Sequence, residues 1–213
     1  MYRRVPATMA IVGLIIFVFV IEITSGMRAW NVGQESMPVL YDLGAVTAGI
    51  FVNGQYWRLL AAMFLHIGLL HIALNLWALY QLGAAFELMF GKARFLLTYF
   101  VSGLVASSAS SYWALIHHRQ ILSAGASGAI FGILGALIIA IRRSPVWRHQ
   151  PWARSLTHQL IFWALLNVFL GFTIPGIDNT GHLGGFAAGL LLGFIPHKVP
   201  PPPARGMTID VGE

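Results

Sequence analysis

Long stretches without charge dominate the pattern along this chain. With histidine counted as neutral, six runs carry no charged residue: 5–21, 59–86, 95–118, 120–141, 155–177 and 179–197. A helix rises about 1.5 Å per residue, so roughly 20 residues cross a bilayer core of about 30 Å. The runs therefore predict six transmembrane helices, at approximately 6–25, 66–88, 94–115, 126–142, 155–173 and 180–197.

The segments outside these runs complete the predicted organisation. Arg3 and Arg4 before the first run leave a signal peptide as an alternative, but the apolar stretch is long for one and favours a retained helix. The segment 26–58 is rich in apolar residues and predicts a membrane-associated loop rather than an unstructured one. We expect one domain over residues 1–198, followed by a Pro-rich, disordered tail at 199–213.

Composition excludes the main alternatives to a membrane protein. Of 213 residues, 57% are apolar and 9% are charged, far below the roughly 25% of charged residues typical of soluble domains. The chain has no cysteine, which excludes disulfides, a thiolate nucleophile and Cys-ligated zinc. The sequence alone thus indicates an all-α membrane protein.

The basic residues set the expected orientation, because cytoplasmic loops are enriched in them. Six spans with a cytoplasmic N-terminus put ten basic residues on the cytoplasmic side and leave Arg28, Arg58 and Arg119 on the other. Both termini are then cytoplasmic. This asymmetry accounts for the net charge of +6 without a nucleic-acid partner.

Three polar clusters within the apolar runs are candidates for chemistry, because polar groups inside a membrane are costly. The first is Gly125-Ala126-Ser127-Gly128, which opens the fourth run. A serine at a helix start lies beside free backbone amides, so a nucleophile there has ready oxyanion donors. The same glycines also fit a simple helix-packing interface, and on this cluster alone that interpretation is the stronger one.

The second cluster is His182, which follows Gly181 near the start of the sixth run. Gly181, Gly185 and Gly189 recur every four residues and predict close approach of another helix. A neutral histidine is the usual general base near pH 7, although it can also form only an interhelical hydrogen bond.

The third cluster is His66, His71 and Asn75. His71 and Asn75 are four residues apart and share a helix face, where both can donate to a developing oxyanion. No carboxylate or third ligand accompanies them at a metal-binding spacing, so we expect neither a metal nor another cofactor. His66 is expected near the interface as a hydrated structural residue.

The predicted topology brings these clusters to one side of the membrane. His71, Ser127 and His182 all fall at the extracytoplasmic ends of inward-running helices, with the fourth helix beginning outside in water. A serine, a histidine and two further donors at one depth form a nucleophile, base and oxyanion constellation.

With these motifs in order, the sequence resembles the rhomboid family of intramembrane serine proteases. The resemblance covers roughly residues 54–196 and rests on four motifs: Trp57-Arg58, His71-x-x-x-Asn75, Gly125-Ala126-Ser127-Gly128, and Gly181-His182 with Gly185 and Gly189. It implies a six-transmembrane-helix rhomboid bundle of the bacterial type.

The resemblance also implies a role for each residue. Ser127 would be the nucleophile and His182 the general base of a dyad, with His71, Asn75 and the Ser127 amide as the oxyanion hole. Gly125 would supply the turn before the serine. Gly128, Gly181 and Gly185 would support the site, Trp57-Arg58 would brace the first loop, and Glu87 would either tether the inner bundle or be an ordinary interfacial acid.

Three further points about the site concern the ring that faces His182, the orientation of His182 and the route of substrate entry. Many relatives carry tyrosine where this chain has Phe131, so ring stacking on His182 is expected without the hydroxyl. No acid is placed to orient His182 as in a triad. Asp178 is one helical turn earlier, and this position disfavours it as the orienting group. In relatives the fifth helix and the next loop gate entry, which here means Trp163, Phe169, Phe172 and 174–177, where Pro175-Gly176 fits a mobile cap or a plain turn.

The expected activity is therefore cleavage of transmembrane segments of membrane-protein substrates by a Ser–His dyad. The expected partners are such substrates and the lipid bilayer, with a multi-pass location in a cell inner (plasma) membrane and a site that opens to the extracytoplasmic side. The alternatives are a catalytically silent rhomboid-like protein that binds or chaperones transmembrane helices, and a transporter or channel. The last lacks charged pairs within the spans and shows no inverted repeat.

Overall fold

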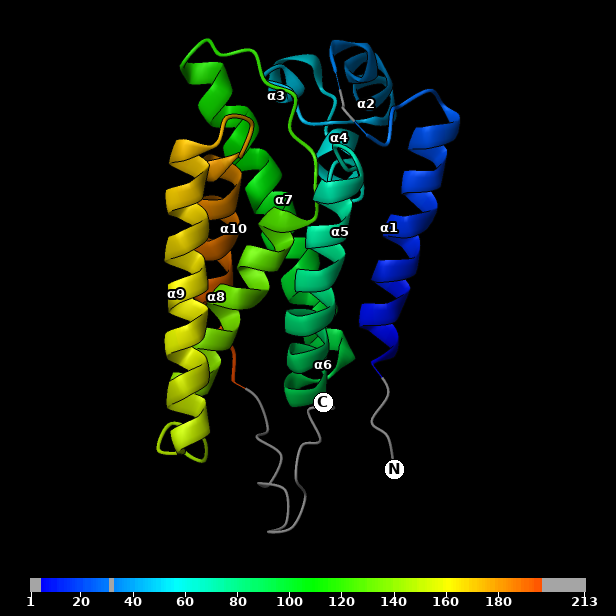
Figure 1. The fold of residues 1–213 in the computed structure, drawn as a ribbon. Coiled ribbons are helices and arrows are strands. Elements are labelled where there is room, and N and C mark those ends of the chain that lie inside the picture. The colour runs from blue at the N-terminus through cyan, green and yellow to red at the C-terminus, as the bar shows by residue number, and fades with distance from the viewer. Residues whose placement is uncertain (1–4, 31–32, 197–213) are drawn as a thin grey trace.

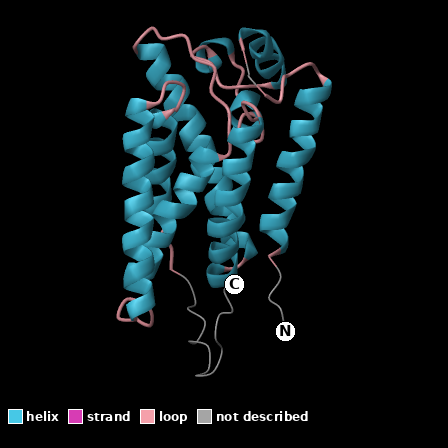
Figure 2. Cartoon of the chain, in the orientation of Figure 1, coloured by secondary structure: helices cyan, strands magenta, loops and turns pink. Residues whose placement is uncertain are grey.

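The computed structural model describes residues 5–30 and 33–196. Over these residues the chain is helical, and Figure 2 shows helices joined by loops. The predicted tail at 199–213 lies outside the described residues. The longer helices are α1 (Pro6–Thr24), α5 (Leu69–Ala78), which continues through the π-helical turn η2 (Leu79–Gly83) into α6 (Ala84–Phe90), α7 (Lys92–Ile116), α8 (Ser127–Arg143), α9 (Pro151–Thr173) and α10 (Asn179–Leu192).

Three helical segments among the described residues are long and apolar enough to cross a membrane: Pro6–Thr24, Leu69–Phe90 and Pro151–Thr173. The sequence prediction of an all-α membrane fold is thereby confirmed. The number of spans stays a prediction, because α8 has 17 residues and α10 has 14.

Helix α8 forms the centre of the bundle, with α7, α9 and α10 packed against it (Figure 1). Thirteen of its 17 residues are buried. A Cβ atom on Gly185 or Gly189 of α10 would overlap the backbone of Gly128 or Gly132 on α8, so the two helices are in backbone contact. The four-residue glycine spacing predicts this approach.

The segment between α1 and α5 folds into short helices over one end of the bundle (Figure 1). These are the 3₁₀ turn η1 (Gln34–Ser36), α2 (Met37–Leu43), α3 (Ile50–Asn53) and α4 (Trp57–Ala61). Their buried residues form two small apolar clusters, one around Leu40 and Leu65 and the other around Val46 and Ile50. The described part of this segment is therefore packed, which accounts for part of its apolar composition.

The connection from α7 to α8 turns back into the bundle. Figure 1 shows it descending from the end of α7, so α8 begins between the two ends of its neighbours and not beyond them. Helix α8 therefore begins inside the bundle, whereas we expected it to begin outside, in water. Backbone hydrogen bonds hold the connection inward: Val46 and Ser123 bond each other at 2.8 and 3.0 Å, and Gly125 N donates to Ala62 O at 2.9 Å.

Candidate active site

Ser127 and His182 meet at the contact between α8 and α10. Ser127 Oγ lies 2.8 Å from His182 Nε2, although the two residues are 55 positions apart in the chain. The glycine contacts between these helices bring the two backbones close enough for short side chains to reach each other. Ser127 is half-buried and His182 is buried, so the pair lies in a largely water-excluded setting.

The ring of His182 is held by stacking. The Phe131 ring lies parallel to it, at 4.4 Å between centroids and 8° between planes. Phe131 is one helical turn after Ser127, so α8 carries both the hydroxyl and the ring that faces His182. The stacking expected from the retained aromatic ring is present.

The orienting contact of a triad is missing among the described residues. His182 Nδ1 is buried and has no hydrogen-bond partner there. Asp178 instead caps α10: its carboxylate accepts from Gly181 N at 2.8 Å and from Ser123 Oγ at 2.7 Å. Asp178 thus ties the segment before Ser127 to the helix that carries His182.

His71 lies beside the serine. A Cβ atom on Gly125 would be 2.8 Å from His71 Cε1 and 3.7 Å from Ser127 Oγ, so the imidazole packs directly against Gly125. Ile67 N–H donates to His71 Nδ1 at 3.1 Å. In the neutral ring the proton is then on Nε2. Of the two ring nitrogens, Nε2 is the one nearer to Gly125, and it is therefore a hydrogen-bond donor.

Asn75 is one turn further along α5 and is 5% exposed. Its Nδ2 donates to the His71 carbonyl at 2.9 Å, and its Oδ1 is buried without a partner among the described residues. The amide group has two N–H bonds. One N–H of Asn75 donates to the His71 carbonyl within the helix, and the second N–H is available to another acceptor.

Two buried residues lie beside the site: His66, which the sequence led us to expect in a hydrated position, and Glu22, which was not identified from the sequence. His66 is fully buried, not hydrated: its Nδ1 lies 3.1 Å from the Phe64 carbonyl, and its Nε2 accepts from Ala126 N at 3.5 Å. Glu22 is also fully buried, and its carboxylate accepts from His66 N at 2.9 Å. A lone carboxylate at the end of an apolar run was the available signal for Glu22.

Arg58 fixes the first loop over the site. It is 3% exposed, and its Nη1 donates to the carbonyls of Tyr41 and Ala45. Its guanidinium also lies over the rings of Tyr41 and Trp57, at 4.3 and 4.8 Å from the centroids. Arg58 thus joins α2, α4 and the turn between them.

Helix α9 carries the apolar residues expected to gate entry. Trp163, Phe169 and Phe172 are all exposed, as is Ile174 after the helix end. Asn179 Nδ2 donates to the Val168 carbonyl at 3.2 Å and links α9 to α10. The turn between them contains Gly176, whose φ of +90° suits glycine.

The described residues include no group of three histidine, cysteine or carboxylate side chains placed to hold a metal ion. The arrangement instead joins a hydroxyl, a base within hydrogen-bonding distance, an imidazole N–H and the first amide of α8. The first amides of a helix lack intrahelical acceptors, so they can bind a developing oxyanion. This combination suits acyl transfer through a serine ester.

Comparisons with known proteins point to one family. A family model described as Rhomboid domain matches residues 53–199. The chain is 38% identical to Rhomboid protease GluP of Bacillus subtilis (strain 168) over 75% of this chain and 30% of that protein. It is 37% identical to RHOMBOID-like protein 5 of Arabidopsis thaliana over 75% of this chain and 50% of that protein. It is also 37% identical to Rhomboid-like protease 3 of Toxoplasma gondii, over 70% of this chain and 55% of that protein. The aligned part thus spans between 30% and 55% of these relatives' lengths.

Proposed function

This chain belongs to the rhomboid family, and on that premise we propose that it is an intramembrane serine endopeptidase that cleaves transmembrane segments with a Ser127–His182 dyad. The observation that carries the proposal is the 2.8 Å contact between Ser127 Oγ and His182 Nε2. Two of the similar proteins are named as proteases, which supports the same reaction class.

The proposed reaction is acyl transfer in two steps. His182 Nε2 takes the proton of Ser127 as Oγ attacks the substrate carbonyl carbon. The resulting oxyanion accepts hydrogen bonds from His71 Nε2–H, the Ser127 amide and Asn75 Nδ2. His182 then protonates the leaving amine, and water attacks the ester to release the second product and restore the serine.

Stacking replaces the missing acid in this scheme. No carboxylate of the described residues lies at His182 Nδ1, so the Phe131 ring fixes the plane of the imidazole. An aromatic pair contributes about 0.5–1.5 kcal/mol. The close packing of α8, α10 and His71 depends on four glycines, which are Gly125, Gly128, Gly181 and Gly185. Trp57-Arg58 serves by holding the first loop over the site.

We further propose an orientation with the site toward the extracytoplasmic side of an inner (plasma) membrane. The start of α1, the α6–α7 junction and the α8–α9 turn lie at one end of the bundle, and α2–α4 lie at the other (Figure 1). The first end carries Lys92, Arg94, Arg142 and Arg143, while the second carries Arg28, Arg58 and Arg119. The positive-inside rule then assigns the first end to the cytoplasm.

The test is cleavage of a model transmembrane substrate by the full chain in liposomes. We expect the wild type to cleave it and both Ser127→Ala and His182→Ala to be inactive. Ser110→Ala, another buried serine, and His117→Ala, an exposed histidine, are the matched controls and should retain activity.

Labelling with a serine-reactive fluorophosphonate separates the possible failures. Labelling that disappears in Ser127→Ala supports the nucleophile even if the chosen substrate is poor. A wild type that neither cleaves nor labels would contradict the protease and favour a silent protein that binds transmembrane helices.

A further inference from the structure

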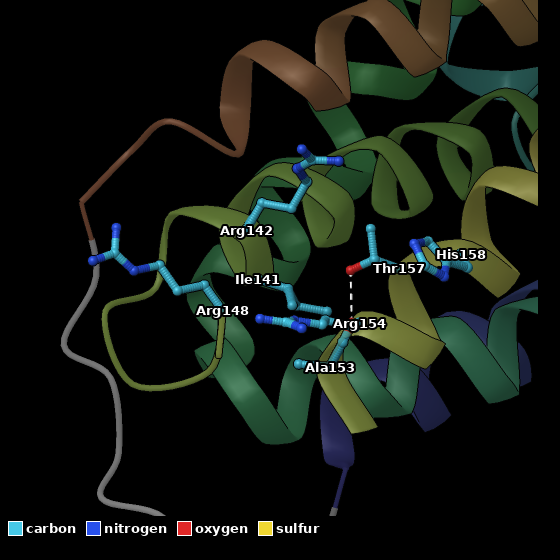
Figure 3. A pocket seen from close by; sticks show the side chains of 7 residues that line it. All are labelled: Ile141, Arg142, Arg148, Ala153, Arg154, Thr157 and His158. Carbon is cyan, nitrogen blue, oxygen red and sulfur yellow. Dashed lines mark hydrogen bonds between the residues drawn. The ribbon is translucent and has the colours of Figure 1, made fainter. Parts of the chain in front are cut away.

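A cavity of about 260 Å³ lies at the end of the bundle away from Ser127, between the C-terminal end of α8 and the start of α9. Figure 3 shows the side chains around it. They are Ile141, Arg142, Arg148, Ala153, Arg154, Thr157 and His158.

The positive charge of this cavity is not balanced by nearby acids. Arg142, Arg148 and Arg154 come from three different segments, and the sequence has no acidic residue from 88 to 177. Within the described ranges the one ion pair joins Arg28 and Glu35, in the first loop. The acids that flank this stretch in sequence are Glu87, whose carboxylate binds the start of α1, and Asp178, whose carboxylate caps α10. Arg148 already donates to His149, whereas no described acid pairs with Arg142 or Arg154, so these two guanidiniums can attract an anion.

The donors suit a phosphate group better than a cation or an apolar ligand. Guanidinium presents several N–H bonds in a planar fork that matches phosphate oxygens. Thr157 Oγ1 already donates to the Ala153 carbonyl at 2.7 Å, as drawn in Figure 3, so the donors for a ligand are those of the arginines. The start of α9 adds the positive end of a 23-residue helix.

The position of the cavity indicates where such a phosphate comes from. Helix α9 is a candidate membrane span that begins at Pro151, so its first residues lie near the bilayer surface. Trp152 is 47% exposed at this start, and exposed tryptophan is enriched at the level of lipid headgroups. Basic pockets between helices at this level bind anionic lipid headgroups.

We propose that this cavity binds the phosphate group of an anionic phospholipid. The site is separate from Ser127 and does not depend on the proposed protease activity. A bound lipid would neutralise the arginines and link α8 to α9, the helix whose other end lies beside the entrance to the proposed active site.

Native mass spectrometry of the purified full chain tests the proposal. The chain in detergent is titrated with phosphatidylglycerol or with phosphatidylcholine of the same acyl chains. We expect the first phosphatidylglycerol to bind more tightly than phosphatidylcholine. Arg154→Gln should weaken it by about fivefold, the contribution of one basic residue near an anionic surface. Arg142→Gln should act in the same direction.

Arg143→Gln is the matched control. Arg143 is at the same end of α8 as Arg142, but its guanidinium lies over the Phe194 ring and does not line the cavity. Equal weakening by Arg143→Gln and Arg154→Gln would overturn the proposal, because the effect would be general surface charge. Binding of inorganic phosphate at the arginines without any preference for phosphatidylglycerol would overturn the lipid as its source.

Discussion

At the scale of single residues, the site depends on small side chains that permit close contacts. Gly125 has a φ of +137°, which L-residues rarely adopt, and the His71 ring fills the space where its Cβ would be. The glycine therefore does two things: it allows the turn that leads to Ser127, and it lets a proposed oxyanion donor approach.

We predict that Gly125→Ala lowers turnover by about 100-fold or more. The added Cβ must displace His71, and removing one oxyanion donor costs roughly 10²–10³ in turnover. The measurement is cleavage of the model substrate in liposomes. The control is Gly91→Ala, because Gly91 also has a positive φ of +85° but has open space around its Cβ position. Equal losses in both variants would attribute the effect to backbone strain and not to His71.

The sequence predicted candidate site residues at positions where a polar side chain interrupts an apolar run. Ser127, His182 and His71 were found in this way, and their geometry is compatible with the expected roles. The burial of His66 and the role of Glu22 were not predicted, because both depend on a contact between residues 44 positions apart. The tie between Ser123 and Asp178 spans 55 positions and has no local signal in the sequence.

At the scale of elements, the contact between α8 and α10 sets the distance within the dyad. A Cβ on Gly189 would overlap the Gly132 carbonyl, and a Cβ on Gly185 would overlap the Gly128 carbonyl. The four-residue spacing predicted a close helix pair. The partner helix and the inward start of α8 could not be predicted, because they depend on how the α7–α8 connection packs against Val46 and Ala62.

We predict that Gly189→Ala destabilises the fold and reduces cleavage. Extra volume in a packed interface costs about 1–3 kcal/mol, and the forced separation of α8 and α10 should lengthen the contact between Ser127 and His182. Thermal unfolding in detergent and substrate cleavage are the two measurements. Gly13→Ala in α1 is the control, since nothing lies within 4 Å of its Cβ position and alanine favours a helix. A Gly189→Ala variant as stable and active as Gly13→Ala would contradict the prediction.

At the scale of the whole molecule, a buried glutamate attaches α1 to the bundle at each end. At the N-terminal end, Glu87 accepts from Ala7 N at 3.0 Å and from Thr8 N and Thr8 Oγ1 at 2.7 Å. At the other end, Glu22 accepts from His66 N, and His66 accepts from Ala126 N, next to Ser127. Of the two interpretations of Glu87, the tether is the one that these contacts support.

The two attachments therefore differ in their distance from the proposed chemistry. We predict that Glu87→Ala destabilises the chain by about 1–3 kcal/mol, because buried N–H donors at the start of α1 lose their acceptor. Fluorophosphonate labelling of Ser127 should persist below the unfolding transition, since α6, which carries Glu87, lies at the opposite end of the bundle from α2–α4 (Figure 1). Thermal unfolding in detergent, followed by tryptophan fluorescence, measures the first effect. Glu35→Ala removes only the exposed pair with Arg28 and should stay within about 0.5 kcal/mol of the wild type. Loss of labelling in Glu87→Ala without a loss of stability would show that α1 influences the site from both ends.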